Sequence, residues 1–281
     1  MELTDPALAR EARVRDPSGV NAFLIVVTLS VKKQHHTPSP AAVPGYGPGI
    51  GGGVPWGFLL VLVGAVTAVG LVAYLSYLST KRRRLGFQTM ARQLGLDYSL
   101  EDPFGLLGLP FSLFRKGDGR GIENVLSGVW QGIDVRAFDY WYYEESTDSN
   151  GRRSRSYSRF DCTVVPLPAS CPELSIGHEN LLTRLAGALS FHDIEFEDGR
   201  FNDAFNVRGN DRKFANDLID ARMMAWLLEH ASDHAFEVVG NRVLVAGPKI
   251  SPTEMIQVIG TAKGFLDHVP KVVFSLYPIS G

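Results

Sequence analysis

The sequence predicts an α+β domain of mainly antiparallel β-hairpins with packed helices, preceded by one transmembrane helix. The first observation is an uninterrupted apolar run at residues 56–78. The second is a series of strand-like runs that are paired across two-residue turns and followed by helices. The third is a capping sequence at residues 251–254, which opens a final amphipathic helix. Strands joined by short turns, with segregated helices, are typical of α+β folds.

Residues 56–78 have the length and composition of a membrane span. They hold no charge over 23 positions. At about 1.5 Å per helical residue they reach roughly 34 Å, enough for a hydrocarbon core of about 30 Å. Trp56 at one end and Tyr74 and Tyr77 at the other match the aromatic belts of membrane interfaces. A buried core helix rarely runs so long without a charge, and the apolar run of a signal peptide is shorter.

Basic residues after the span predict its orientation. Lys81, Arg82, Arg83 and Arg84 follow the apolar run, whereas the preceding stretch of about 20 residues holds no Lys or Arg. By the positive-inside rule, we expect a single-pass protein of the cell inner (plasma) membrane, with its N-terminus outside and its C-terminal domain in the cytoplasm. The lipid bilayer is an expected partner, with these four basic side chains and the three aromatic ones at the membrane interface.

Five segments follow from these patterns. The predicted boundaries are residues 1–54 for a flexible Pro/Gly-rich tail, 55–79 for the transmembrane helix, 80–93 for a basic juxtamembrane helix, 94–275 for the cytoplasmic α+β domain and 276–281 for a C-terminal tail. A segment rich in Pro and Gly buries too little apolar area to offset chain entropy, which predicts that the first segment is flexible. Whether translation starts at Met1 or downstream, at Val27 or Val31, stays open.

Charge is distributed unevenly along the chain. The 281 residues carry a formal net charge of −2 and a mean hydropathy of +0.01. Nine Lys/Arg and four Asp/Glu up to residue 84 leave 19 basic and 26 acidic residues after it, a charge of −7 for the domain. Nucleic-acid binding requires a basic surface to neutralise phosphates, so we expect no nucleic acid as a partner.

The first half of the domain reads as hairpins. Strand-like runs at residues 122–130 and 133–143 flank Gln131-Gly132, a two-residue turn with a permissive glycine. The apolar phase of the second run shifts near residues 137–139, which predicts a bulge there. A polar loop is predicted over 144–156 and a further strand over 157–167, with Phe160, Cys162 and Val164 on one face.

The second half alternates hairpins and helices. Asp198-Gly199 and Gly240-Asn241 are interpreted as hairpin turns between short strands. Two short helices are predicted over 211–219 and 223–230, with a break near Asp220. The last helix opens with the 251–254 capping sequence and ends at Pro270. Its predicted apolar stripe consists of Ile256, Ile259, Ala262, Leu266 and Val269.

Several short motifs carry a resemblance to a known family. The motifs are Ile122-Glu123-Asn124-Val125-Leu126-Ser127-Gly128, Phe138-Asp139-Tyr140, Phe201-Asn202-Asp203-Ala204-Phe205-Asn206-Val207, Asp211, Phe214-Ala215 and the run from Met223 to Leu228. From about residue 94 to 269, the chain resembles an uncharacterised family of actinobacterial single-span membrane proteins, known as a domain of unknown function. Its members often have proline just before the Arg-Met-Met run, where this chain has Ala221. The resemblance implies this layout and supplies no site.

Histidines and cysteines are the weak candidates for chemistry. His230 and His234 are four residues apart, as metal-binding imidazoles on one helix face can be, but no third or fourth ligand is evident, so we expect no metal. A cationic histidine at a helix C-terminus is the favoured interpretation. His192 lies on a predicted strand, where a solvated face is favoured over acid–base catalysis. Cys162 in the core and Cys171 in a predicted loop are expected to be free thiols, with a disulfide between them only if the domain faced outside.

These patterns favour a non-enzymatic interaction or sensor module that is anchored in the membrane and binds an unknown protein partner. We expect no cofactor. One alternative is a membrane-tethered hydrolase-type enzyme that uses His192 or the His230/His234 pair. Another is a module that binds a small ligand or lipid with the aromatic residues of its strands. Those residues are Trp130, Phe138, Tyr140, Trp141, Tyr142 and Tyr143, and the adjacent arginine-rich segment is either a lipid-facing loop or a solvated hairpin tip.

Overall fold

The computed structural model describes residues 56–185 and 192–279. The predicted tail at 1–54 and the alternative starts at Val27 and Val31 lie outside the described residues. The chain divides between Arg82 and Arg83 into two units, which are described separately below.

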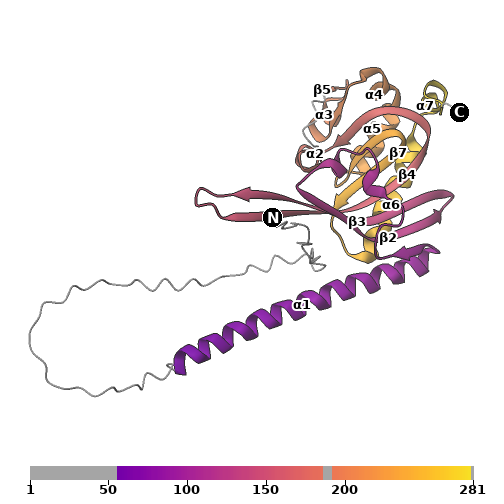
Figure 1. Ribbon diagram of the computed structural model, residues 1–281. Helices are drawn as coiled ribbons and strands as arrows, with labels where there is room; N and C mark the ends of the chain where they lie inside the picture. Colours follow the sequence, from indigo (N-terminus) through magenta and orange to yellow (C-terminus); the bar gives the residue numbers. More distant parts are fainter. Residues whose placement is uncertain (1–55, 186–191, 280–281) are drawn as a thin grey trace, which may run out of the picture. The chain divides into compact units, whose positions relative to one another are not determined.

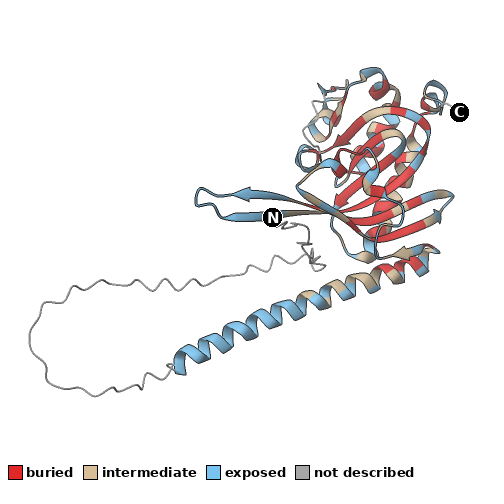
Figure 2. Ribbon diagram, viewed as in Figure 1, coloured by how far each residue is buried: buried red, intermediate tan, exposed pale blue. Residues whose placement is uncertain are grey.

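The first described element is α1 (Trp56–Leu94), one continuous helix of 39 residues where the sequence predicted two (Figure 1). Its apolar window has a mean hydropathy of 2.5 and no buried residue, and among the described residues it is the one helix long and apolar enough to cross a membrane (Figure 2). The hydroxyls of Thr67 and Ser76 donate to the carbonyls of Val63 and Val72, four residues earlier. These bonds satisfy the two hydroxyls within the helix, as a span in lipid requires.

The second unit is built on an antiparallel sheet, and its described part confirms the α+β fold. Seven strands form the sheet within the described residues: β1 (Asp97–Ser99), β2 (Gly119–Trp130), β3 (Ile133–Thr147), β4 (Arg153–Gly177), β5 (His192–Asp193), β6 (Asn206–Gly209) and β7 (Ala235–Pro248). Their order is β1-β2-β3-β4-β6-β5, and β7 also pairs with β4. All of these pairs are antiparallel. β4 is the central strand, because it pairs with β3, β6 and β7.

Short helices connect and cover the strands. They are η1 (Leu106–Gly108), η2 (Leu113–Arg115), α2 (Glu179–Leu185), α3 (Gly199–Ala204), α4 (Arg212–Leu218), α5 (Ala221–His230), η3 (Pro252–Glu254), α6 (Met255–His268) and α7 (Lys271–Leu276). The predicted break near Asp220 is confirmed, because the Asp220 carboxylate accepts the Met223 N–H and caps α5. The capping box of Ser251 and Glu254 is also confirmed, and it opens η3, which leads into α6.

Two hydrophobic clusters pack on the sheet. One contains the last turns of α1 together with α4, α5 and α6, and includes Phe87, Met90 and Phe265. The other lies under the segment that carries η1 and η2, and includes Tyr140 and Phe160. Cys162 and Val164 share this second cluster with Phe160, as the sequence predicted. Side chains alternate between the two faces of a strand, so β2, β3, β4 and β7 contribute to both clusters.

The predicted hairpin at Gln131-Gly132 is confirmed. Both turn residues have positive φ, 48° and 81°, which suits the tight turns that match strand twist. The predicted bulge exists, but it lies on the partner strand β2, where Asn124 and Val125 together oppose Phe138. Asn124 takes a φ of 55°, so the extra residue is accommodated there and β3 continues without a break.

Three local predictions were wrong. The predicted loop at 144–156 is mostly strand, because cross-strand pairs continue out to Thr147 and Arg153. Asp198-Gly199 is no hairpin turn: the Asp198 carboxylate accepts the Arg200 N–H and starts α3. Gly240 does not reverse the chain, because β4 is long enough to pair with β7 on both sides of it, as Phe236 with Ile176 and Val245 with Thr163.

Smaller differences concern the cysteines and the C-terminal segment. Cys162 and Cys171 are both free and buried, and Cys171 lies in β4 rather than in a loop. Their partners on β7, Ala246 and Gly240, are six residues apart, roughly 20 Å along a strand, so a disulfide between the two cysteines is excluded on either side of a membrane. In α6 the buried stripe is shifted to Met255, Val258, Ile259, Ala262 and Phe265. After α7, Tyr277 donates to the Asp217 carboxylate.

Candidate functional site

The first notable site is where α1 meets the sheet, at the start of the second unit. The Arg83 guanidinium grips the Asp139 carboxylate with two bonds, Nε to Oδ2 at 2.7 Å and Nη2 to Oδ1 at 2.6 Å. Nη2 also lies 2.7 Å from Oδ1 of Asp161, and Nη1 donates to the Ile250 carbonyl at 2.6 Å. The Arg83 side chain is only 14% exposed, so these contacts draw a cation of the basic run into the domain.

The β2 bulge completes this group, which we call the Arg83 cluster: Arg83, Asp139, Asp161, Asn124 and the Ile250 backbone. The Asn124 amide donates to Oδ2 of Asp139 at 2.9 Å, and its Oδ1 accepts from the Tyr98 hydroxyl. The positive φ of Asn124 aims this side chain across the sheet. The bulge residue Asn124 therefore helps to orient the Asp139 carboxylate toward Arg83 of α1.

Asp161 is the most perturbed member of the Arg83 cluster. It is fully buried and faces Asp139 across the β3–β4 pair. Burial and then repulsion from Asp139 raise its pKa to about 7, although Arg83 and the Ile250 N–H counteract this. The carboxylates of Asp139 and Asp161 thus share one guanidinium. Their other hydrogen-bond donors are the Asn124 amide and the Ile250 N–H.

A second buried carboxylate, Glu237, fastens the covering segment to β7. Its oxygens accept the Ser112 N–H at 2.7 Å, the Ser112 hydroxyl at 2.6 Å and the Leu113 N–H at 3.1 Å. These groups lie at the start of η2, so Glu237 acts as a cap supplied from a distant strand. Burial raises the pKa of Glu237 to about 7, and its hydrogen bonds oppose that rise.

The aromatic residues of β3 divide between the two faces of the sheet. Phe138, Tyr140 and Tyr142 are buried in the second cluster, with the Tyr140 hydroxyl donating to the Leu113 carbonyl. Trp141 and Tyr143 point to the other face, the one that carries Asp139. The sequence grouped all of these aromatics as one candidate surface; only those on the Asp139 face remain partly exposed.

We call Trp141, Tyr143 and Tyr157 the aromatic face. The rings of Trp141 and Tyr143 are stacked with centroids 6.4 Å apart, and Tyr157 lies 5.4 Å from Tyr143. They lie over glycines of β2: a Cβ on Gly121 would meet the Trp141 ring at 2.6 Å. Glycine here is required by the close approach of the aromatic ring to the neighbouring strand.

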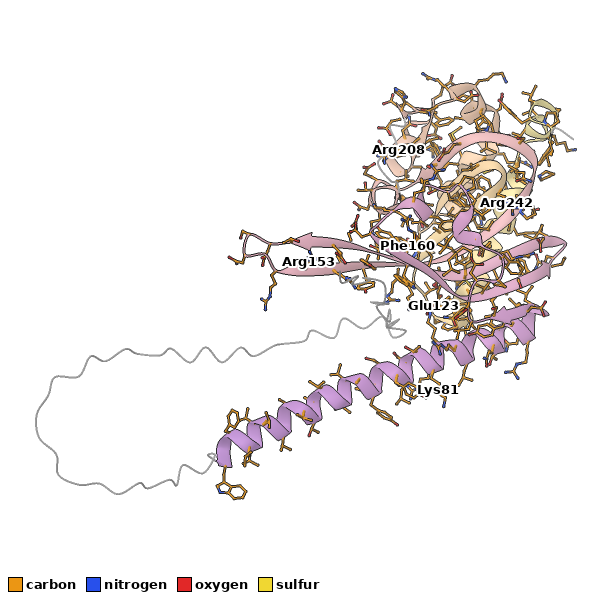
Figure 3. The ribbon with its side chains drawn as sticks, in the orientation of Figure 1. Lys81, Glu123, Arg153, Phe160, Arg208 and Arg242 are labelled. Atoms are coloured by element: carbon orange, nitrogen blue, oxygen red, sulfur yellow. The ribbon has the colours of Figure 1, made fainter. Side chains whose placement is uncertain are left out.

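Arginines border the aromatic face. Arg155 lies over the Tyr143 ring at 4.7 Å and pairs with Glu145, and Arg159 lies over Tyr157 at 5.8 Å. Arg153 lies close to the tip of the projecting β3–β4 hairpin, away from the body of the domain (Figure 3). This edge of the domain therefore combines stacked aromatic rings with guanidinium groups.

The residues predicted for the membrane interface have different surroundings. Trp56, Tyr74 and Tyr77 are 82%, 58% and 60% exposed on the first unit. Lys81 and Arg82 are also exposed. In the second unit, Arg83 is committed to its cluster, while Arg84 is half-buried and its Nε lacks a hydrogen-bond partner among the described residues.

The histidines occupy unlike environments. His192 is exposed on β5. His230 ends α5, half-exposed and stacked on Trp226 with ring centroids 6.2 Å apart. His234 lies against Gly247, and burial lowers its pKa. Across residues 56–185 and 192–279, no group of three or more His, Cys, Asp or Glu side chains is arranged to hold a metal ion.

Sequence reasoning missed the residues that the structure brings together. Asp139, Asp161 and Glu237 are acids within otherwise apolar strands, and that placement was the available signal. Asn124 and Asp139 lie within the motifs that carry the family resemblance, which gives those motifs a structural role. Their convergence with Arg83 depends on contacts between residues 56 and 78 positions apart, which no local pattern encodes.

Comparisons with known proteins show a likeness to a solved structure. No protein-family model matches the sequence, and no curated protein matches it. Among solved structures, the chain is similar to the crystal structure of the mycobacterial trehalose monomycolate transport factor A, TtfA, with a TM-score of 0.50. The identity is 15%, and the match covers 71% of this chain and 97% of that chain. At this identity the likeness shows a shared fold.

Proposed function

We propose that the chain is a single-pass inner-membrane protein whose C-terminal domain is a non-enzymatic interaction module on the cytoplasmic side. The Arg83 cluster carries this proposal. Arg83 follows the apolar run by five residues and is bound by carboxylates from β3 and β4. Asp161, the acid whose pKa is raised most strongly, thus helps to hold the segment that follows the apolar run.

The proposed partner is a protein of a membrane transport machinery. The shared fold with a transport factor for trehalose monomycolate supports this choice. The proposed anchoring supports it as well, because it would hold the domain at the membrane surface. The buried acids support a binding role over catalysis, because Asp139, Asp161 and Glu237 are engaged by arginine or by backbone N–H groups.

Anchoring and sidedness are tested together in native membranes. The native thiols are buried, so a Val129→Cys variant places one reactive thiol on the domain, at a side chain that is 67% exposed. We expect the protein to resist alkaline carbonate extraction, and a membrane-impermeant maleimide to label this thiol only after the cells are permeabilised. Ser39→Cys, before the span, is the matched control and should label in intact cells. Release by carbonate, or labelling of Val129→Cys in intact cells, overturns the proposal.

The partner class is tested by proximity labelling with a biotin ligase fused to the C-terminus of the full chain. The matched control fuses the ligase directly after residue 82, which keeps the span and removes the domain. We expect integral membrane transport proteins to be enriched by the full chain alone. Equal enrichment by both fusions would show that the domain does not select the partner.

A further inference from the structure

The β3–β4 hairpin extends beyond the two hydrophobic clusters. Pairing continues from Tyr143 with Tyr157 out to Thr147 with Arg153, while every residue from 144 to 156 is exposed. The hairpin projects from the body of the domain as a pale-blue arm (Figure 2). An exposed two-stranded arm of this length gains little stability from the core, so packing of the domain does not account for it.

The direction of this arm follows from how the last turns of α1 lie on the sheet. Arg83 contacts Asp139 and Asp161. Thirteen residues later, Leu96 lies against Gly128, which pairs with Val135. The chain therefore enters the domain beside the middle of β3 and continues away from the hairpin, toward the Gln131-Gly132 turn. The Arg83 cluster and the aromatic face also share one face of the sheet.

Chain length limits how far Arg83 can lie from a bilayer that holds the apolar run. The apolar run ends at residue 78, and even a fully extended stretch of five residues to Arg83 spans at most about 17 Å. From Asp139, the strand continues for eight residues to Thr147, roughly 26 Å. A hairpin that starts beside Arg83 can therefore reach the headgroups of the membrane in which the chain is anchored.

The chemistry of the hairpin suits anionic headgroups. Residues 144–159 hold four arginines and three acids, in a domain that is otherwise acidic. Glu145 is paired with Arg155, and Asp148 accepts the Asn150 and Arg152 N–H groups in the turn. Arg152 and Arg153 are exposed at the tip of the hairpin. The aromatic face at its base contains Trp and Tyr, the residues that favour membrane interfaces.

We propose that the β3–β4 hairpin docks on the surface of the bilayer that anchors the chain, with Arg152 and Arg153 bound to the phosphates of anionic lipids and the aromatic face turned toward the headgroups. This inference rests on the proposed membrane anchoring. It adds a second contact, by which the domain would be held at a defined orientation to the membrane.

The test uses the full chain in nanodiscs of phosphatidylcholine, with or without phosphatidylglycerol. An Asn150→Cys variant carries an environment-sensitive fluorophore at the hairpin tip, and headgroup spin-labelled lipid serves as the quencher. The matched control is the same fluorophore at Val129→Cys, beside the turn at the opposite end of β2 and β3. Cys162 and Cys171 are buried and should not take up the fluorophore.

We expect strong quenching at position 150 in phosphatidylglycerol nanodiscs, reduced by high salt and by omission of the anionic lipid, with little quenching at position 129. The double variant Arg152→Glu and Arg153→Glu should lower the ratio of docked to undocked hairpin at least about 25-fold, because each basic residue near an anionic surface contributes roughly fivefold. The exposed pair Arg200→Glu and Arg242→Glu is the charge-matched control and should leave quenching unchanged.

Each alternative outcome has a separate meaning. Equal quenching at positions 150 and 129, or equal losses in the two double variants, overturns hairpin docking. A chain that is not retained in nanodiscs overturns the anchoring proposal itself. An unaltered near-UV circular dichroism spectrum of the hairpin double variant confirms that its fold is intact, so a loss of quenching reports on docking.

Discussion

At the residue scale, Arg83 contrasts with its neighbours in the basic run. Lys81 and Arg82 are exposed, whereas Arg83 is held by Asp139 and Asp161. A charge leaves water at a cost of several kcal/mol, which its partners must offset through good geometry. The two-bond contact with Asp139 supplies that geometry, and the Phe87 ring lies 5.2 Å below the guanidinium.

We predict that Arg83→Met destabilises the domain by about 3 kcal/mol, because two carboxylates are then left without their cation. Arg82→Met removes the same charge from an exposed side chain and should change the free energy of unfolding by no more than about 0.5 kcal/mol. Urea unfolding in detergent micelles, followed by near-UV circular dichroism, measures both. Equal effects of the two substitutions would contradict the role assigned to Arg83.

Stability should fall as the pH rises from about 4 to 7. Asp161 has an ordinary pKa of 3.8 and a pKa of about 7 in the fold, so the folded state retains a proton that the unfolded state releases. Retention of this proton stabilises the fold fully below pH 3.8, and the stabilisation is lost as the pH rises through about 7. Glu237 contributes in the same direction.

Asp161→Asn should reduce this pH dependence, because the amide cannot ionise yet keeps an acceptor for the Ile250 N–H. Asp148→Asn, in the exposed hairpin tip, is the control and should leave the slope in place. Urea midpoints measured between pH 4 and 8 give the comparison, and an undiminished slope in Asp161→Asn contradicts the assignment.

At the element scale, polar side chains set the boundaries of the helices that cover the sheet. Asp198, Asp211 and Asp220 each accept a backbone N–H at a helix start. The Asp198 cap explains why a helix stands where a hairpin turn was predicted, whereas Asp211 and Asp220 cap helices that the sequence predicted. The Asn202 amide bonds both backbone groups of Phe196, and this contact replaces the strand pairing that a hairpin would have provided.

Asp220→Ala should cost about 1 kcal/mol of stability, because α5 loses its N-cap bond to Met223. Glu229→Ala, near the exposed C-terminal end of the same helix, should stay within about 0.5 kcal/mol of the parent. The shift in urea midpoint distinguishes them, and an Asp220→Ala variant as stable as Glu229→Ala would rule out capping as the reason that α5 starts there.

At the scale of the whole molecule, β4 connects both hydrophobic clusters. It pairs with β3, β6 and β7, and its two cysteines lie in different clusters. Burial raises the pKa of Cys171 to about 12 and raises that of Cys162 as well. Both thiols are therefore protonated and shielded in the fold.

The thiols should report on opening of the whole domain. We predict that neither reacts with a thiol reagent under native conditions and that both react in denaturing urea, with equal results with and without prior reduction. Val129→Cys is the positive control and should react at once. Rapid native reaction of Cys171 would show that the second half of β4 opens independently of the rest.

Local patterns were sufficient for the features that depend on neighbouring residues. The charge-free run at 56–78, the Gln131-Gly132 turn and the capping box at Ser251 each arise from short-range geometry or composition, and the structure has the helix, the turn and the cap. The burial of Arg83, the strand position of the bulge and the length of β7 depend on partners far along the chain. A sequence pattern records which residues prefer a strand or a helix, whereas the partner strand and the buried charge it meets are selected by long-range packing.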